Sequence, residues 1–245
     1  MKLRPLFWPT VVALPALIVL LWLGTWQVQR LEWKNQLIED FESRANAAPI
    51  DLPLGVIDRE MEFRRLGLAG RFDHAKEVFM TGRTYEGNAG FHIVTPFTLD
   101  DGRMILVNRG WVSESYRDPA KRNFTLVEGE TQIEAIIRFP NKKGYFVPEN
   151  DPENGFWFTL VPAQIVSHLQ LDGQAETAVY AAALRTSDEI RLPIGARTET
   201  NLRNSHLGYA ITWYGIACAL IGVYLAFHFQ AGRLTIGAWG RDPEA

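Results

Sequence analysis

Soft metal ligands and an excess of charge are both missing from this sequence. The chain has 245 residues and one cysteine, Cys218, so it can form no intramolecular disulfide and no Cys-x-x-Cys redox or zinc site. Its 4 methionines are dispersed, which argues against copper(I) chaperoning, because that role needs clustered thiolate or thioether ligands. A net charge of −3 provides no electrostatic footprint for nucleic acid, so we expect no nucleic-acid partner.

Motifs of the common catalytic sites are also missing. The sequence contains no H-E-x-x-H, G-x-S-x-G or G-x-x-x-x-G-K-[ST] pattern. Its 5 histidines lie far apart along the chain, at His74, His92, His168, His206 and His228. A hydrolase is not excluded by these absences, but nothing in the sequence supports one.

Two long apolar runs are present instead. Uncharged residues cover 6–26 and, with His228 neutral, 207–229. About 20 residues rising 1.5 Å each cross the roughly 30 Å hydrocarbon core of a bilayer. A cleavable signal peptide is the alternative for the first run, but its apolar region would be only about 7–15 residues long. We therefore predict transmembrane helices over 6–27 and 206–229, with both termini on one side of the membrane.

The segment between the runs, 28–205, predicts one α+β domain. Helical spacing covers 34–48 and stops at Pro49, and a second short helix is expected over 162–169. Because few long crossovers connect the strand candidates, we expect a mainly antiparallel sheet. The strand candidates, separated by turn formers, are 62–72, 77–84, 91–99, 104–111, 131–139 and 177–184.

Three polar segments of this domain each have two interpretations. The segment 73–77 (DHAKE) is a polar turn or an acid–base site. The segment 108–111 (NRGW) is a strand end with a glycine bulge, or it presents Arg109 to an anion. The turn-rich loop 148–155 either binds a partner or only reverses the chain.

His206 opens the second apolar run, at its domain-side edge. Ionisable residues at such places suggest function, and on an ideal helix Ala210, Trp213 and Ala217 share its face. The alternative is an interfacial histidine that faces lipid headgroups. Small residues occupy nearly the opposite face, which we expect to pack on the first run near Thr10, leaving the His206 face open. They are Gly208, Thr212, Gly215, Ala219, Gly222 and Ala226.

Six sequence blocks point to a known family. They are 23–34 (LGTWQVQRLEWK), 62–65 (EFRR), 94–97 (VTPF), 107–111 (VNRGW), 148–152 (PENDP) and 206–215 (HLGYAITWYG). In composition and order they resemble the Surfeit locus protein 1 family of cytochrome c oxidase assembly factors. One departure is Asn204-Ser205 before the histidine, where Asn-Asn or Asn-Arg is expected.

The resemblance implies a non-enzymatic assembly factor for haem–copper terminal oxidases, which binds haem A and assists its delivery or insertion into the catalytic subunit. It implies an inner-membrane protein, bacterial or mitochondrial, whose tails 1–5 and 230–245 are cytoplasmic and whose α+β domain is extracytoplasmic. The family's proposed haem ligand falls on His206, which makes Ala210 and Trp213 candidate cofactor contacts. Expected partners are the catalytic subunit, membrane lipid and the haem A synthesis machinery.

Helix geometry limits how a haem could be held. His206 and His228 are about 33 Å apart along a helix rising 1.5 Å per residue, so they cannot ligate one iron. A single axial ligand suits a carrier that releases its cargo. Two other functions remain open: a scaffold that stabilises an oxidase intermediate without binding haem, and, with less support, an enzyme that modifies haem.

The predicted topology can be tested with fusions. A reporter that is active only in the periplasm should be silent after Gly240 and active when inserted in an exposed loop of 28–205, because two spans return the chain to the cytoplasm. Reporter activity after Gly240 would rule out the two-span arrangement.

Overall fold

The computed structural model describes residues 2–171, 173–185, 192–197 and 205–235. The chain forms two compact units, one made of Met1–Glu39 with Asn201–Ala245 and the other of Asp40–Thr200. Part of the predicted C-terminal tail, 236–245, lies outside the described residues.

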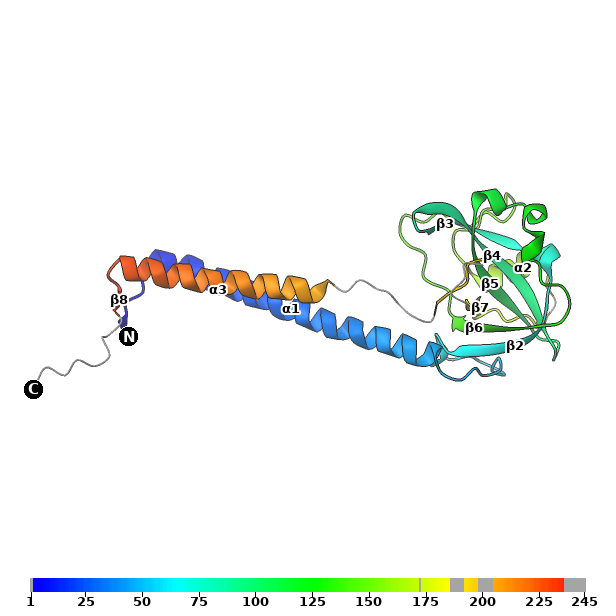
Figure 1. Ribbon diagram of the computed structural model, residues 1–245, viewed down its shortest axis with the longest axis horizontal. Helices are drawn as coiled ribbons and strands as arrows, with labels where there is room; N and C mark the ends of the chain where they lie inside the picture. Colours follow the sequence, from blue (N-terminus) through cyan, green and yellow to red (C-terminus); the bar gives the residue numbers. More distant parts are fainter. Residues whose placement is uncertain (1, 172, 186–191, 198–204, 236–245) are drawn as a thin grey trace, which may run out of the picture. The chain divides into compact units, whose positions relative to one another are not determined.

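The first unit consists of two long helices that lie side by side, α1 (Phe7–Ala45) and α3 (His206–Gln230) (Figure 1). Both are long and apolar enough to cross a membrane, with mean hydropathies of 2.0 and 1.8 over an 18-residue stretch of each helix. The predicted span 6–27 and the predicted helix 34–48 are one continuous helix, because no glycine or proline separates them. Short strands β1 (Lys2–Leu3) and β8 (Leu234–Thr235) pair antiparallel beside the helix ends.

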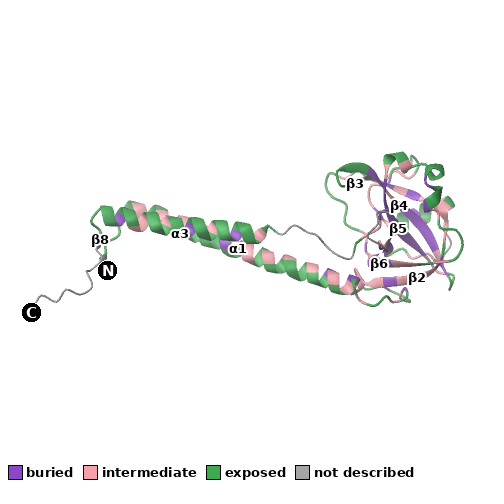
Figure 2. Ribbon diagram, viewed as in Figure 1, coloured by how far each residue is buried: buried purple, intermediate pink, exposed green. Residues whose placement is uncertain are grey.

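Large apolar side chains cover the outer surface of this pair. The exposed fractions of Trp8, Val12 and Val223 are 74%, 69% and 68%, and Figure 2 shows exposed residues along both helices. In water such a surface would be unfavourable by roughly 25 cal/mol for each Å² of apolar area. Lipid removes this penalty, so the pair has the surface of a membrane-embedded hairpin.

The face of α3 that contacts α1 is opposite to the one expected. Ala210 and Ala217, on the His206 face, are each 2% exposed, whereas a Cβ atom added at Gly208, Gly215 or Gly222 would meet no other atom within 4 Å. The prediction that the small-residue stripe packs on the first span is therefore wrong. Close approach occurs instead at a glycine of α1, Gly24, where the Tyr214 ring leaves no room for a Cβ atom.

Hydrogen bonds near both ends of the pair explain this choice of face. At the tail end, Leu6 N–H donates to His228 Nε2 at 3.0 Å, and the Thr10 and Tyr224 hydroxyls are 2.6 Å apart. At the domain end, the Thr25 and Tyr214 hydroxyls are 3.1 Å apart. Polar groups in lipid gain most by bonding to one another, so these contacts fix the antiparallel register.

The second unit is built from six strands and one short helix. Every predicted strand is present, with bounds shifted by a few residues, and the helix α2 covers Pro162–His168. The strands are β2 (Arg65–Phe72), β3 (Val78–Tyr85), β4 (Asn88–Leu99), β5 (Met104–Ser113), β6 (Thr131–Arg138) and β7 (Tyr180–Ala183). Five 3-10 turns connect them: η1 (Arg59–Met61), η2 (His74–Lys76), η3 (Glu114–Tyr116), η4 (Pro119–Lys121) and η5 (Asn123–Thr125).

The sheet is mixed, which corrects the expectation of a mainly antiparallel sheet. Its order is β2-β6-β7-β5-β4-β3, and a further pairing of β2 with β4 closes the first five strands into a ring. The pairing of β5 with β7 is parallel. The cause is the long connection 139–179, which contains α2 and inserts β7 between β5 and β6.

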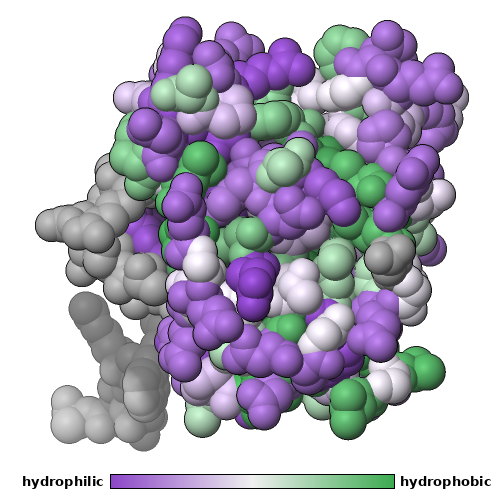
Figure 3. All heavy atoms as spheres, turned by 90° about the vertical axis from the view of Figure 1, so that its right-hand side faces the viewer, coloured by the Kyte–Doolittle hydropathy of each residue, from purple (hydrophilic) through white to green (hydrophobic). Residues whose placement is uncertain are grey.

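Strand alternation separates an inner and an outer apolar cluster. Leu66, Phe97, Val107, Ile137 and Ala181 come from all five ring strands and share one cluster, as expected for the interior of a small barrel. The other cluster covers the outside of the strands. It includes Leu106, Ile136, Trp157, Ile165 and Tyr180, together with Phe41 and Ala45 from the last turn of α1. The surface seen in Figure 3 is largely hydrophilic.

A buried ion network ties the segment 114–126 to the barrel. Glu77, 3% exposed in its side chain, accepts from Arg109 at 3.0 Å and from Arg122 through its other carboxylate oxygen. Arg122 also donates to the Tyr116 carbonyl at 3.0 Å, and Arg109 donates to the Thr125 carbonyl. Burial by itself would raise the pKa of Glu77, but hydrogen bonding and charge from Arg122, with Arg109, outweigh it and hold this pKa below 4.5.

This network predicts that the substitution Glu77→Gln strongly destabilises the folded protein. Removal of the carboxylate leaves two arginines buried without their counter-charge, so the free energy of unfolding should fall by about 3 kcal/mol or more. Thermal unfolding of the full chain in detergent measures this change. Asp101→Asn is the matched control, since Asp101 makes an exposed pair with Arg103 and should contribute less than about 1 kcal/mol.

The destabilisation caused by Glu77→Gln should depend on pH. The pKa of Glu77 in the folded protein is below the ordinary value of 4.5. The stabilisation by its carboxylate is therefore present above pH 4.5 and is lost as the pH falls through the lowered pKa of the folded state. The difference in stability between wild type and Glu77→Gln should therefore shrink in acid. A difference that stays constant down to strongly acidic pH would argue against an ionised Glu77.

Helix pairing gives a second prediction. Ala217→Leu should weaken the pair by about 1–3 kcal/mol, because a larger side chain overfills the contact, whereas Gly215→Leu should leave the pair intact. Engineered cysteines in a Cys218→Ala background provide the measurement. Crosslinks to 17–21 of α1 should form from position 217 and not from 215; the reverse result would restore the small-residue interface.

Candidate functional site

His206 is the first residue of α3, and its ring is held by α1. The ring Nδ1 lies 2.7 Å from Oε1 of Gln27, and the side chain is half-buried. With the amide oxygen as acceptor, Nδ1 donates, and in a neutral imidazole the lone pair is then on Nε2. A second-sphere carbonyl on one ring nitrogen is the usual arrangement of a histidine that binds metal through the other.

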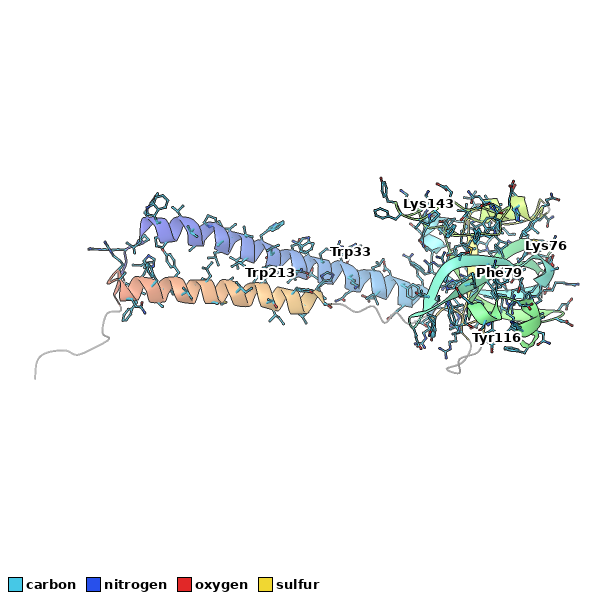
Figure 4. The ribbon with its side chains drawn as sticks, turned by 90° about the horizontal axis from the view of Figure 1, so that it is seen from above. Trp33, Lys76, Phe79, Tyr116, Lys143 and Trp213 are labelled. Carbon is cyan, nitrogen blue, oxygen red and sulfur yellow. The ribbon has the colours of Figure 1, made fainter. Side chains whose placement is uncertain are left out.

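The two other predicted site residues share this face of α3. Ala210 lies one turn from His206 and is buried, and Trp213, labelled in Figure 4, is half-buried on the same side of the helix. The structure therefore brings His206 and Ala210 together at the contact with α1. The expectation that this face is open to lipid or to a partner is wrong, because α1 covers it.

The donor set fits a single axial ligand. Among the residues described, no group of three or more His, Cys, Asp and Glu side chains could hold a metal ion. His228, near the other end of α3, is fully buried, with Nε2 accepting from Leu6 N–H and Nδ1 2.8 Å from the Tyr224 carbonyl. Of the two histidines in the helix unit, His206 is therefore the one at the domain end of α3.

Two positioning contacts could not be predicted from the sequence. Gln27 contacts the His206 ring, and the Thr25–Tyr214 hydroxyl pair lies farther toward the middle of the helices. A signal for Gln27 exists in the sequence, since it is the first amide after the apolar run 6–26. Its partner could not be identified without knowing which faces of the helices meet.

The segment 108–111 has a structural role. Gly110 has a φ of +121° and a Cβ there would lie 2.1 Å from the Ile194 carbonyl oxygen, so this position requires glycine. The strand register shifts here, which confirms the predicted bulge. Asn108 accepts from Gly110 N–H at 3.1 Å and contacts His92 Nδ1 at 3.2 Å. Arg109 is committed to Glu77 rather than to an outside anion.

His92 is held neutral in this setting. Burial, with the nearby charge of Arg83, lowers the pKa of His92 to about 4. Its ring lines a small cavity with Tyr85 and Trp111, whose rings are 5.5 Å apart. These contacts rigidify the end of the barrel.

The loop 148–155 is held by one amide side chain. Asn150 Oδ1 accepts from Phe158 N–H at 2.8 Å and Thr159 N–H at 2.9 Å, while its Nδ2 donates to the Thr159 carbonyl at 2.8 Å. Asp151 pairs with Phe156 and accepts from the Asn154 side chain at 2.8 Å. The loop is therefore ordered by its own polar residues.

Comparison with known proteins supports the resemblance of the six sequence blocks. The sequence profile of the SURF1 family matches residues 14–218. Surfeit locus protein 1 of Homo sapiens is 36% identical over 218 residues, covering 80% of this chain and 70% of that protein. The protein of the same name from Rattus norvegicus is 36% identical over 217 residues, covering 80% and 68%. A SURF1-like protein of Monosiga brevicollis is 33% identical over 233 residues, covering 88% and 86%. With its matched blocks, its paired apolar helices and its intervening domain, the chain belongs to the SURF1 family.

Proposed function

We propose that this protein is an assembly factor for haem–copper terminal oxidases, the role for which its family is known. In this proposal it binds haem A as cargo and assists its delivery or insertion into the catalytic subunit. The observation that carries the haem proposal is His206, oriented by Gln27 at the end of an apolar helix. A non-catalytic role agrees with the family and with the lack of a catalytic motif in the sequence.

The proposed location is the bacterial cytoplasmic membrane, or the mitochondrial inner membrane in a eukaryote. Helices α1 and α3 cross it, and the barrel domain lies on the periplasmic side. The exposed apolar side chains of both helices support the crossing. Membrane lipid, the catalytic oxidase subunit and the haem A synthesis machinery are the partners that this placement provides.

The residues of this chain have separate tasks in that role. Gln27 Oε1 accepts a hydrogen bond from Nδ1–H of His206, which favours the tautomer that would bind iron through Nε2. Ala210 packs against α1 and so holds the helix that carries His206, while Trp213 is half-buried on the same side of α3. With one ligand from this chain, the second axial position of the iron is left to solvent or to the recipient, which favours release over storage.

The alternative is a scaffold that stabilises an oxidase intermediate without binding haem. One observation favours it: the His206–Gln27 hydrogen bond also closes the domain end of the helix pair, where Ala210 is buried against α1. In that function His206 would serve helix pairing only. Haem occupancy then separates the two proposals.

His206→Ala should remove most bound haem A, because the other histidine of the helix unit, His228, lies near the opposite end of α3 and cannot replace the imidazole. The measurement is the absorption spectrum of protein purified from cells that make haem A, together with active oxidase in their membranes. Gln27→Ala should reduce occupancy less, by about tenfold in affinity, as for other second-sphere partners. His168→Ala, on α2, is the matched control and should retain wild-type occupancy.

Full haem occupancy in a stable His206→Ala variant would exclude the ligand assignment. If that variant were haem-free but assembled oxidase normally, the delivery role would be wrong. If both variants lacked haem only because the helix pair had separated, crosslinking between α1 and α3 would be lost as well. His206→Gln, which keeps a hydrogen-bonding side chain, would then restore crosslinking without restoring haem.

A further inference from the structure

A cationic cavity lies on the outside of the barrel, within the second unit. Its volume is about 360 Å³, and it is lined by Thr81–Arg83 of β3, by the loop 141–148, by 158–160 and by Tyr180 of β7. Three of the lining side chains are cationic, Arg83, Lys142 and Lys143, and none is acidic. Lys143, which is labelled in Figure 4, pairs with Glu149 outside the cavity.

The charge of the other two cations is not balanced by the protein. Within the part of the chain that the structure describes, no carboxylate lies at ion-pair distance from Arg83 or Lys142. Arg83 is half-buried, and burial lowers its pKa, although a guanidinium stays charged. One of its nitrogens donates to the Phe158 carbonyl at 2.8 Å, which holds the guanidinium at the cavity wall.

Tyr180 adds a hydroxyl donor at the cavity wall. The residue is only 8% exposed and lines the cavity, yet the described residues offer its hydroxyl no hydrogen bond. Burial raises the pKa of this phenol, so the hydroxyl keeps its proton and remains a donor. An acceptor inside the cavity would therefore give this hydroxyl a hydrogen bond.

One wall of the cavity is fixed before any ligand arrives. The segment 157–159 is bound to β3, because Thr81 N–H donates to the Trp157 carbonyl at 2.7 Å. It is also bound to the loop 148–155, through the side chain of Asn150. Beside the cavity, Tyr145 and Phe146 are each 93% exposed, with ring centroids 5.1 Å apart. Exposed aromatic rings next to fixed cations suit a ligand that has an apolar body and a negative end.

We propose that this cavity binds an amphipathic oxyanion, a carboxylate or phosphate carried on an apolar body. The anion accepts from Tyr180 and Arg83 and is neutralised by Lys142, while the apolar body packs on Phe146 and Phe158. Two sources have this chemistry, a free carboxylate such as the propionate of a porphyrin and the headgroup of an anionic phospholipid. The proposal is independent of His206 and of haem iron.

The test uses the full chain in nanodiscs of zwitterionic lipid. The probe is metal-free protoporphyrin, which retains two carboxylates but cannot ligate through iron, and its dimethyl ester provides a ligand without negative charge. Wild-type protein should bind the diacid saturably, as followed by porphyrin fluorescence, and should bind the ester at least about tenfold more weakly.

Matched variants locate the site. Arg83→Gln and Tyr180→Phe should each weaken binding of the diacid by about tenfold, since each removes a donor to a charged group. Lys121→Gln makes the same change of charge on an exposed residue outside the cavity and should bind within about twofold of wild type. His206→Ala should also bind normally, which keeps this test separate from that of the haem ligand.

Anionic nanodiscs then show whether the cavity binds a lipid headgroup or a free carboxylate. If phosphatidylglycerol in the disc weakens porphyrin binding to wild type but not to Arg83→Gln, the occupant is a lipid headgroup; unchanged binding assigns the cavity to a free carboxylate. The proposal is overturned if no saturable binding occurs in zwitterionic discs, if the ester binds as tightly as the diacid, or if folded Arg83→Gln and Tyr180→Phe bind like wild type.

Discussion

Hydrogen bonding between α1 and α3 is the constraint that sets the membrane-type unit of this protein. Apolar side chains give two helices no reason to prefer one another over lipid, so polar contacts and close packing decide which faces meet. Here those contacts are concentrated near the two ends, at Leu6 with His228 and at Gln27 with His206. Between them, Ala210 and Ala217 pack closely. The face of α3 is therefore chosen by its polar residues, and the glycines are left outside.

The barrel unit depends on strand pairing around a closed ring. Closure of five strands through the β2–β4 pairing removes edges from the ring and encloses one apolar cluster. The segment 114–126 carries few apolar anchors, and it is attached by Arg122 and Arg109 through Glu77. A buried pair of this kind adds little net stability compared with apolar packing, but loss of one member is costly. The ion network of Glu77 therefore fixes the position of the irregular segment 114–126 on the barrel.

Sequence patterns predicted the positions of the helices and strands well, but they did not predict which helix faces and which strands pair. Apolar length predicted α3, and alternation predicted all the ring strands, because both signals are local. The parallel position of β7 depends on a long connection whose course is not encoded in any short window. The continuity of α1 was missed because the change from apolar to amphipathic residues at 28–34 looks like a boundary, although nothing there ends a helix. Arg122 and Tyr180 carried no local signal, since their importance comes from Glu77 and Arg83, which are distant in the sequence.

The packing of α3 also changes how haem delivery by His206 would work. Gln27 and Ala210 place the ligand face against α1, so a flat cargo could not lie along that face while the two helices remain in contact. Access is therefore restricted to the domain end of α3, where His206 is the first helical residue, or it requires the helices to part there. The hydrogen bond from His206 to Gln27 and the hydroxyl pair at Thr25 oppose such parting, each by about 1 kcal/mol. If His206 is a haem ligand, contacts this weak would allow loading and release without unfolding the helix pair at its tail end.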